Sequence, residues 1–76
     1  ETKLYPNPAT DKENVSSTHA MERITVLNYV GQVVFNQELS GEKAVTLNTA
    51  SYESGVYVVR IETTDATITK RVVITK

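Results

Sequence analysis

The sequence predicts an all-β domain, a small antiparallel β-sandwich of about seven strands, and three observations lead to this fold class. Apolar residues recur with period two along much of the chain, which is typical of half-buried strands. Val, Ile and Thr, which favour strands, are abundant, and no segment has a convincing helical pattern. Turn signals recur at intervals of about 8–12 residues, as they do in sandwiches and barrels. We expect an immunoglobulin-like arrangement, with a small open barrel as the alternative.

The strands are expected to follow one another along the chain with short connections. A short extended segment, Thr2–Tyr5, comes first, and an irregular strand with Val15 directed inward lies between Asp11 and Thr18. Glycine or polar residues then mark turns at Gly31, at Ser40–Lys43 and at Thr64–Asp65. The remaining strands are predicted at Glu22–Tyr29, Gln32–Leu39, Ala44–Leu47, Val56–Thr63 and Thr67–Thr75.

Alternation along the last two strands predicts which side chains enter the core. Tyr57, Val59 and Ile61 fall on one face of the most apolar strand. We expect the Tyr57 ring to be buried and its hydroxyl to bond back to the preceding loop, which Gly55 closes with a positive φ or a close neighbour. In the last strand Val72 and Ile74 should face inward and Lys70 the rim, whereas Arg71, Val73 and Thr75 should face outward.

Two prolines close the first strand, in the stretch LYPNPAT from Leu4 to Thr10. Pro6 and Pro8 each lack a backbone donor and fix φ near −65°, and each pushes the preceding residue toward an extended conformation. Neither a helix nor a central strand can pass through this segment. An edge strand tolerates both prolines, because its outward donors have no partner to lose. The sequence therefore predicts a rigid corner beside an edge strand.

Length and composition bound what the chain can be. Seventy-six residues make one small domain, residues 1–76, and the absence of cysteine excludes disulfides and thiolate metal sites. A formal net charge of −1 gives no electrostatic case for binding nucleic acid or an anionic membrane. No apolar run approaches the roughly 20 residues of a membrane-spanning helix. Because the chain shows neither an initiator Met nor a signal-peptide pattern, we expect it to be a piece of a longer precursor.

The residues that could carry chemistry are few. His19 could pair with a serine and with Asp11 or Asp65 as a triad, but it lies in a polar stretch where a solvated loop residue is the simpler interpretation. His19 has no second His or Cys to complete a metal site, and no two acids share an apolar wall. Asn14-Val15-Ser16 matches the glycosylation pattern, which arises often by chance. We expect no enzyme, no cofactor and no small-molecule substrate.

Binding surfaces are the better prospect. The four tyrosines, Tyr5, Tyr29, Tyr52 and Tyr57, could form an aromatic platform for carbohydrate, although core and strand positions explain them as well. The ending KRVVITK, Lys70–Lys76, is consistent with an edge strand whose charges prevent aggregation. The alternative is that a partner recognises this terminal strand by strand addition, and edge strands of this kind also allow self-association.

Four segments, taken together and in order, resemble a known family. Tyr5-Pro6-Asn7-Pro8 opens the chain, Asn28 with Gly31 gives a hairpin pattern, Gly55-Val56-Tyr57 supplies Gly-x-Tyr, and Lys70–Lys76 is a basic and apolar ending. This order and spacing resemble the type A C-terminal sorting domain of the type IX (Por) secretion system of Bacteroidetes, over essentially the whole chain. One departure is Tyr52, where the family commonly has Leu. A second is the polarity of residues 11–21.

The resemblance implies a role as well as a fold. Domains of this family are immunoglobulin-like sandwiches at the C-terminus of secreted cargo, which crosses the periplasm and is recognised by an outer-membrane translocon. A surface sortase then removes the domain, and the cargo is secreted or attached to the cell surface. The partners implied are therefore the translocon, the sortase and an upstream cargo domain. The residues that the resemblance marks for recognition are Tyr5, Pro6, Asn7, Pro8, Gly31, Gly55, Tyr57, Lys70, Arg71, Val72, Val73, Ile74 and Lys76.

Two other functions remain open at this point. A structural or adhesive spacer in a surface protein would use the same sandwich, and a carbohydrate-binding module would use the tyrosines. A sorting signal must lie at the C-terminus of its precursor, whereas a spacer need not. The parent reading frame distinguishes the two.

Overall fold

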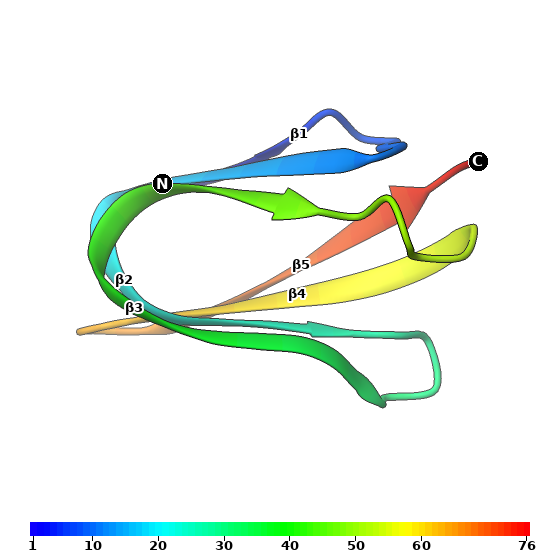
Figure 1. Ribbon diagram of the computed structural model, residues 1–76. Helices are drawn as coiled ribbons and strands as arrows, with labels where there is room; N and C mark the ends of the chain where they lie inside the picture. The colour runs from blue at the N-terminus through cyan, green and yellow to red at the C-terminus, as the bar shows by residue number, and fades with distance from the viewer.

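The computed structural model describes residues 1–76, and every regular element in it is a β-strand (Figure 1). Neighbouring strands pair antiparallel throughout. The structure has no helix that could span a membrane. The strands are β1 (Thr2–Tyr5), β2 (Lys12–Leu27), β3 (Val33–Asn48), β4 (Gly55–Thr63) and β5 (Thr67–Ile74).

The long strands β2 and β3 bend near their middles, so that each contributes to two packed layers (Figure 1). In the first layer Val15 of β2 lies between Leu4 of β1 and Val45 of β3. In the second layer Ile24 of β2 lies between Gln37 of β3 and Ile61 of β4, and β5 follows on the far side of β4. The prediction of an all-β antiparallel fold is confirmed, and the two layers give it the form of a sandwich.

The structure has five strands rather than about seven, because two predicted breaks are bends inside continuous strands. The pairing of β2 with β3 shifts register between Ser16 and Met21, where β2 passes from one layer to the other. On β3 the predicted turn at Ser40–Lys43 is the corresponding bend, and Gly41 takes a φ of 94° there. Register shifts bend a strand without ending it, so each long strand covers two of the predicted segments.

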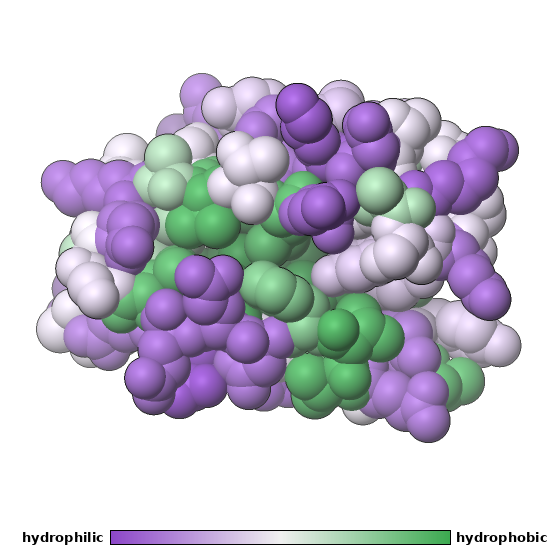
Figure 2. Space-filling view, in the orientation of Figure 1, coloured by the Kyte–Doolittle hydropathy of each residue, from purple (hydrophilic) through white to green (hydrophobic).

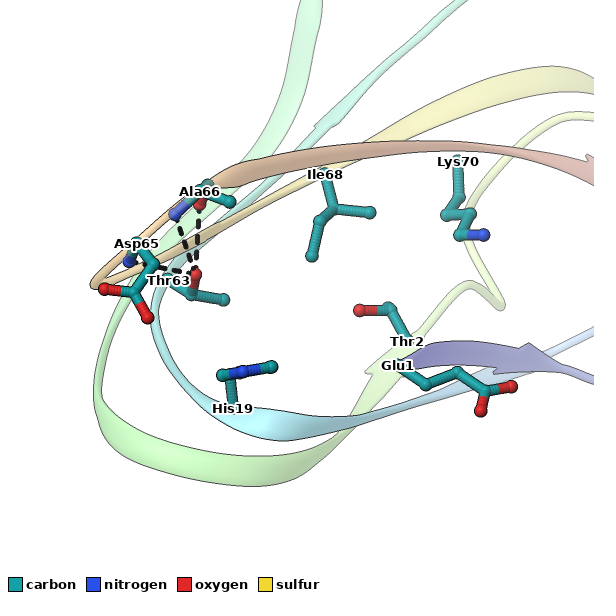
Figure 3. Close-up of a pocket in the computed structure, with 8 residues that line it drawn as sticks. All are labelled: Glu1, Thr2, His19, Thr63, Asp65, Ala66, Ile68 and Lys70. Carbon is teal, nitrogen blue, oxygen red and sulfur yellow. Dashed lines mark hydrogen bonds between the residues drawn. The ribbon is translucent and has the colours of Figure 1, made fainter.

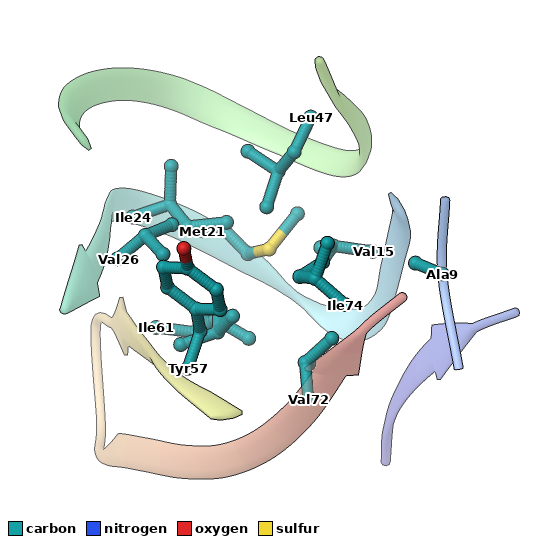
Figure 4. Packing of buried hydrophobic residues seen from close by; sticks show 11 residues of the cluster. Ala9, Val15, Met21, Ile24, Val26, Leu47, Tyr57, Ile61, Val72 and Ile74 are labelled. Carbon is teal, nitrogen blue, oxygen red and sulfur yellow. The ribbon is translucent and has the colours of Figure 1, made fainter. Parts of the chain in front are cut away.

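The core lies between the layers and is formed by alternating residues of β2, β4 and β5 (Figure 4). The predicted inward faces are confirmed: Val15, Tyr57, Val59 and Ile61 are buried. Val72 and Ile74 of β5 are buried as well, whereas Arg71 and Thr75 are exposed and Val73 is half-buried. The buried apolar residues are Ala9, Val15, Met21, Ile24, Val26, Leu47, Tyr57, Val59, Ile61, Val72 and Ile74.

Tyr57 connects the core to the loop before β4, as the sequence predicted. Its hydroxyl donates a hydrogen bond to the carbonyl of Glu53 at 2.8 Å, while its ring lies among the buried residues (Figure 4). The Tyr52 ring packs on the Tyr57 ring, with 5.2 Å between the ring centroids. Tyr52 stands at the position where sorting domains commonly have Leu, and its ring makes the apolar contact there. Burial raises the pKa of the Tyr52 hydroxyl above its ordinary value, and the neighbouring Tyr57 hydroxyl raises it further.

We predict that Tyr57→Ala destabilises the fold by about 3–5 kcal/mol, because it removes a buried ring and leaves a cavity. Tyr57→Phe keeps the ring and loses only the bond to Glu53, which costs about 1 kcal/mol. Urea unfolding of both variants measures the two terms separately. An alanine variant within about 1 kcal/mol of the parent would contradict the packing of this ring.

Glu13 is an acidic residue inside the core, where it explains part of the unexpected polarity of residues 11–21. It is 1% exposed, and neither carboxyl oxygen has a hydrogen-bond partner. Together with Leu47, Tyr57, Val72 and other residues it lines a cavity of about 10 Å³. Burial raises the pKa of the Glu13 carboxyl from its usual 4.5 to about 7.

We predict that the fold loses stability as the pH rises from about 4.5 to above 7. In this interval the folded chain keeps the Glu13 proton and the unfolded chain releases it, so raising the pH favours unfolding. The difference between the two pKa values corresponds to about 3 kcal/mol at most. Glu13→Gln, which carries no charge, should remove this pH dependence. Urea unfolding of both proteins at several pH values measures it, and an unchanged slope in the variant would contradict the assignment.

Candidate recognition surface

Segments that are far apart in the sequence gather at one end of the sandwich. The corner after β1, the hairpin between β2 and β3, the loop before β4 and the C-terminus all lie at the right-hand end in Figure 1. The bends of β2 and β3 and the turn between β4 and β5 lie at the opposite end. All four motifs singled out in the sequence therefore reach a single end of the molecule, which we call the recognition end.

The proline corner lies along the outer edge of β5. The Val73 N–H donates to the side-chain oxygen of Asn7 at 3.1 Å. Ala9 then pairs with the same edge through its backbone, donating to the Val73 carbonyl and accepting from the Thr75 N–H, both at 2.8 Å. Ala9 is fully buried, whereas Pro6 and Pro8 are exposed. The first motif and the last are thus joined by three hydrogen bonds, which we call the clasp.

Lys76 fixes the end of the chain to two loops. Its ammonium donates to the carbonyls of Thr10, Thr49 and Ala50, at 2.6, 2.8 and 3.1 Å. Its backbone N–H donates to the Ser54 hydroxyl at 3.0 Å. Three backbone carbonyls thus hold the ammonium in place. Lys76 therefore holds the corner and the loop before β4 together.

The Gly-x-Tyr motif is the start of β4, which pairs with the inner edge of β5. Gly55 pairs with Ile74 and Tyr57 with Val72. The φ of Gly55 is positive, at 158°, and close to fully extended; no atom lies within 4 Å of the position that a Cβ would take. A close neighbour is therefore not the reason for glycine here. β5 is held on one side by Gly55–Tyr57 and on the other by the proline corner.

Asn28 organises the hairpin that joins β2 to β3. Its side-chain oxygen accepts hydrogen bonds from the Val30 and Gln32 N–H groups, at 3.1 and 2.9 Å. Its side-chain amide donates to the Gln32 side chain at 3.0 Å. Gly31 has a φ of 90°, which residues with a Cβ rarely adopt, so the predicted turn is confirmed and its need for glycine is explained. The hairpin is therefore rigid at its tip.

The hairpin and the strands beside it expose apolar side chains. Tyr29 is 82% exposed and Val30 is 61% exposed, at the tip that Asn28 fixes. Figure 2 shows an apolar area near the start of β3, next to hydrophilic side chains. A rigid tip that presents an aromatic and an aliphatic side chain can enter a pocket on a partner at low entropic cost. The large apolar residues exposed on the whole surface are Tyr5, Tyr29, Val30, Val33, Val34 and Val56.

Lys70 and Arg71 are exposed cations on β5 that form no ion pair or hydrogen bond within the chain. The one ion pair of the structure joins Arg23 to Glu38 on other strands. Lys70 points toward the space between the layers, as the rim position predicts (Figure 3). These two charges are therefore available for an acidic partner.

Two of the residues considered for catalysis, His19 and Asp65, lie at the other end, whereas Asp11 accepts a hydrogen bond from the Thr49 N–H at the recognition end. His19 and Asp65 line a hollow of about 400 Å³ together with Thr2, Ile68 and Lys70 (Figure 3). The His19 ring lies 3.3 Å from the Thr18 hydroxyl, and no hydrogen bond joins it to an acid. No group of three His, Asp or Glu side chains comes together to hold a metal. The structure does not assemble the triad that the sequence allowed.

The four tyrosines do not form one platform. Tyr52 and Tyr57 contact each other, and Tyr57 is buried. Tyr5 and Tyr29 are exposed and form no aromatic pair. The arrangement that a carbohydrate platform would need is therefore absent.

Several residues at the recognition end had no signal in the sequence. Ala9 follows Pro8 in the corner, and only its small size hints at a buried position. Thr10 and Thr49 act through backbone carbonyls, which any residue would supply. The one sign that Glu13 is buried is its position two residues before Val15, because residues two positions apart lie on the same face of a strand.

The fold and this surface define a small all-β module of the antiparallel sandwich class, whose motifs converge on one end. A comparison with models of protein families matched the family described as "Secretion system C-terminal sorting domain" over residues 3–75. The chain belongs to this family, which confirms the resemblance to type IX sorting domains. Domains of the family act as signals rather than as catalysts, and they mark the protein that carries them for export. A comparison with curated proteins found no match.

Proposed function

We propose that the recognition end and β5 form the surface by which a type IX outer-membrane translocon recognises an exported cargo, and that a surface sortase afterwards removes the domain. The observation that carries this proposal is the meeting of three of the four motifs on β5, where the proline corner binds one edge through the clasp and Gly55–Tyr57 pairs with the other. The fourth motif, the hairpin of Asn28 and Gly31, reaches the same end of the molecule (Figure 1). Such an arrangement presents residues from both ends of the chain as one rigid surface.

The chemistry of this surface suits a protein partner. Lys70 and Arg71 supply charge that no acid of the chain neutralises. Tyr29 and Val30 supply apolar anchors on a rigid hairpin. Interfaces of this kind combine central apolar anchors with charges that steer the encounter. The domain passes through the periplasm in this scheme, and the cargo is then secreted or attached to the surface.

The role of a spacer has less support. A spacer needs only a stable sandwich, and nothing in such a role requires two adjacent cations without ion pairs. Membership of a family of sorting domains also favours the signal.

Deleting Val72–Lys76 is a poor test, because Val72 and Ile74 belong to the core and the truncated chain would unfold. The double variant Lys70→Glu with Arg71→Glu changes exposed side chains, so it should keep stability within about 0.5 kcal/mol per substitution. We predict that this variant lowers the surface-to-periplasm ratio of a fused reporter at least about tenfold, since it replaces two attractive charges by repulsive ones.

The matched control is Arg60→Glu, which reverses an exposed charge on the neighbouring strand β4. This control should export the reporter normally. The melting temperature of each variant shows whether the fold is intact. Normal export by the folded double variant would refute a role for these charges in recognition.

A further inference from the structure

The outer edge of β5 is only partly occupied. β5 is the last strand of its layer and pairs with β4 on its inner side. On the outer side, Val73 and Thr75 bond to the corner through their backbones. Because backbone groups alternate along a strand, the N–H and C=O groups of Thr67, Thr69 and Arg71 point to the same outer side. No strand pairs with them there.

A hollow lies beside this open half of the edge. The hollow of about 400 Å³ lies between β1 and β5, and the side chains of Thr2 and Ile68 point into it (Figure 3). Thr2 is only 9% exposed, and its buried hydroxyl has no hydrogen-bond partner within the chain. An unpaired backbone edge next to a hollow is the usual site of strand addition.

The sequence along this edge is complementary to itself when it is read antiparallel. If two copies pair with Ile68 opposite Ile68, then Arg71 of one copy comes beside the partner's turn between β4 and β5, which carries Asp65. Both side chains are exposed, and neither forms an ion pair within its own chain. Lys70 then stands opposite the partner's Ala66, which is small enough to leave room for it.

We propose that the chain forms a homodimer in which two β5 strands pair antiparallel through their outer edges, about a two-fold axis at Ile68. The two second layers then become one continuous sheet. Thr67 of each copy pairs with the partner's Thr69 through backbone hydrogen bonds, which the outward direction of these groups requires. Ile68 packs on the partner's Ile68 at the axis.

Charge selects this register over its neighbours. Moving the axis to Thr67 or Thr69 takes Arg71 away from the partner's Asp65. Moving it to Lys70 sets two ammonium groups opposite each other, which is unfavourable. The free edge of β3 is the other candidate for self-pairing. Its two straight parts, Val33–Glu38 and Ala44–Asn48, carry a single charge between them and offer no such complementarity.

The dimer has a consequence for recognition. It covers the backbone edge beside Lys70 and Arg71, so monomer and dimer differ in whether that edge is accessible to another partner. This consequence rests on the proposed function, whereas the pairing itself does not.

Sedimentation equilibrium of the purified chain tests the pairing without any secretion component. The interface is small, so we expect a weak dimer that appears between roughly 10 μM and 1 mM. Arg71→Asp and Asp65→Arg should each lower the association constant by about tenfold or more, and the double exchange should restore it to within about threefold. A monomer at every concentration, or a double exchange that restores nothing, would overturn the proposal.

Cysteine cross-linking tests the position of the axis. The chain has no cysteine, so a single substitution gives an unambiguous product. Residues that face each other in a non-hydrogen-bonded pair have Cα atoms about 4.5 Å apart, a separation that a disulfide accepts. Ile68→Cys should therefore form a covalent dimer on mild oxidation. Gln37→Cys, on the free edge of β3, is the matched control and should stay monomeric.

Cross-linking of the Gln37→Cys variant at an equal or higher rate would place the interface on β3 and refute the proposal. Failure of a folded Ile68→Cys variant to cross-link would refute it as well. Should Ile68→Cys not fold, the charge exchange, which changes only exposed residues, decides the question alone.

Discussion

Three hydrogen bonds between the proline corner and the outer edge of β5 fix the arrangement of the recognition end. β5 is a terminal strand whose inner edge is held by β4, and without the corner its last residues would have one neighbour only. Asn7 and Ala9 satisfy the outward groups of Val73 and Thr75. Pro6 and Pro8 limit the conformations of this segment, so less entropy is lost when it docks on the strand. Lys76 continues the attachment through the three carbonyls that it binds.

This constraint links stability to recognition. The inner face of β5 supplies Val72 and Ile74 to the core and ends at Lys70 on the rim, while Arg71 lies on its exposed face, and neither cation forms an ion pair. A substitution on the inner face therefore acts on folding, and one on the exposed face can act on binding alone. The open half of the edge, from Thr67 to Arg71, is the part that the corner does not reach. It is the place where a second copy or another partner can pair with the backbone.

Much of the fold could be predicted from local patterns, and the site only in part. Alternation identified the inward faces of β4 and β5, because a side chain's face follows directly from its position in a strand. It could not show that β2 and β3 continue through their bends, since a bend and a turn use the same polar residues and glycine. The motifs identified Asn7 and Tyr57, but pairing between residues 66 positions apart, as in Asn7 with Val73, has no local signal. The burial of Glu13 could not be predicted from its residue type, because an acid without a partner is normally disfavoured in a core.

Amide hydrogen exchange in Asn7→Ala tests most directly whether the corner holds β5 in place. The variant removes the acceptor of the Val73 N–H and leaves the core unchanged. Loss of one hydrogen bond of about 1 kcal/mol should make the Val73 amide exchange about fivefold faster, with a smaller effect at Thr75. The Val59 amide, in the centre of the sheet, should exchange at its original rate. Unchanged protection at both Val73 and Thr75 would contradict the account, because the corner would then not be what holds the edge of β5.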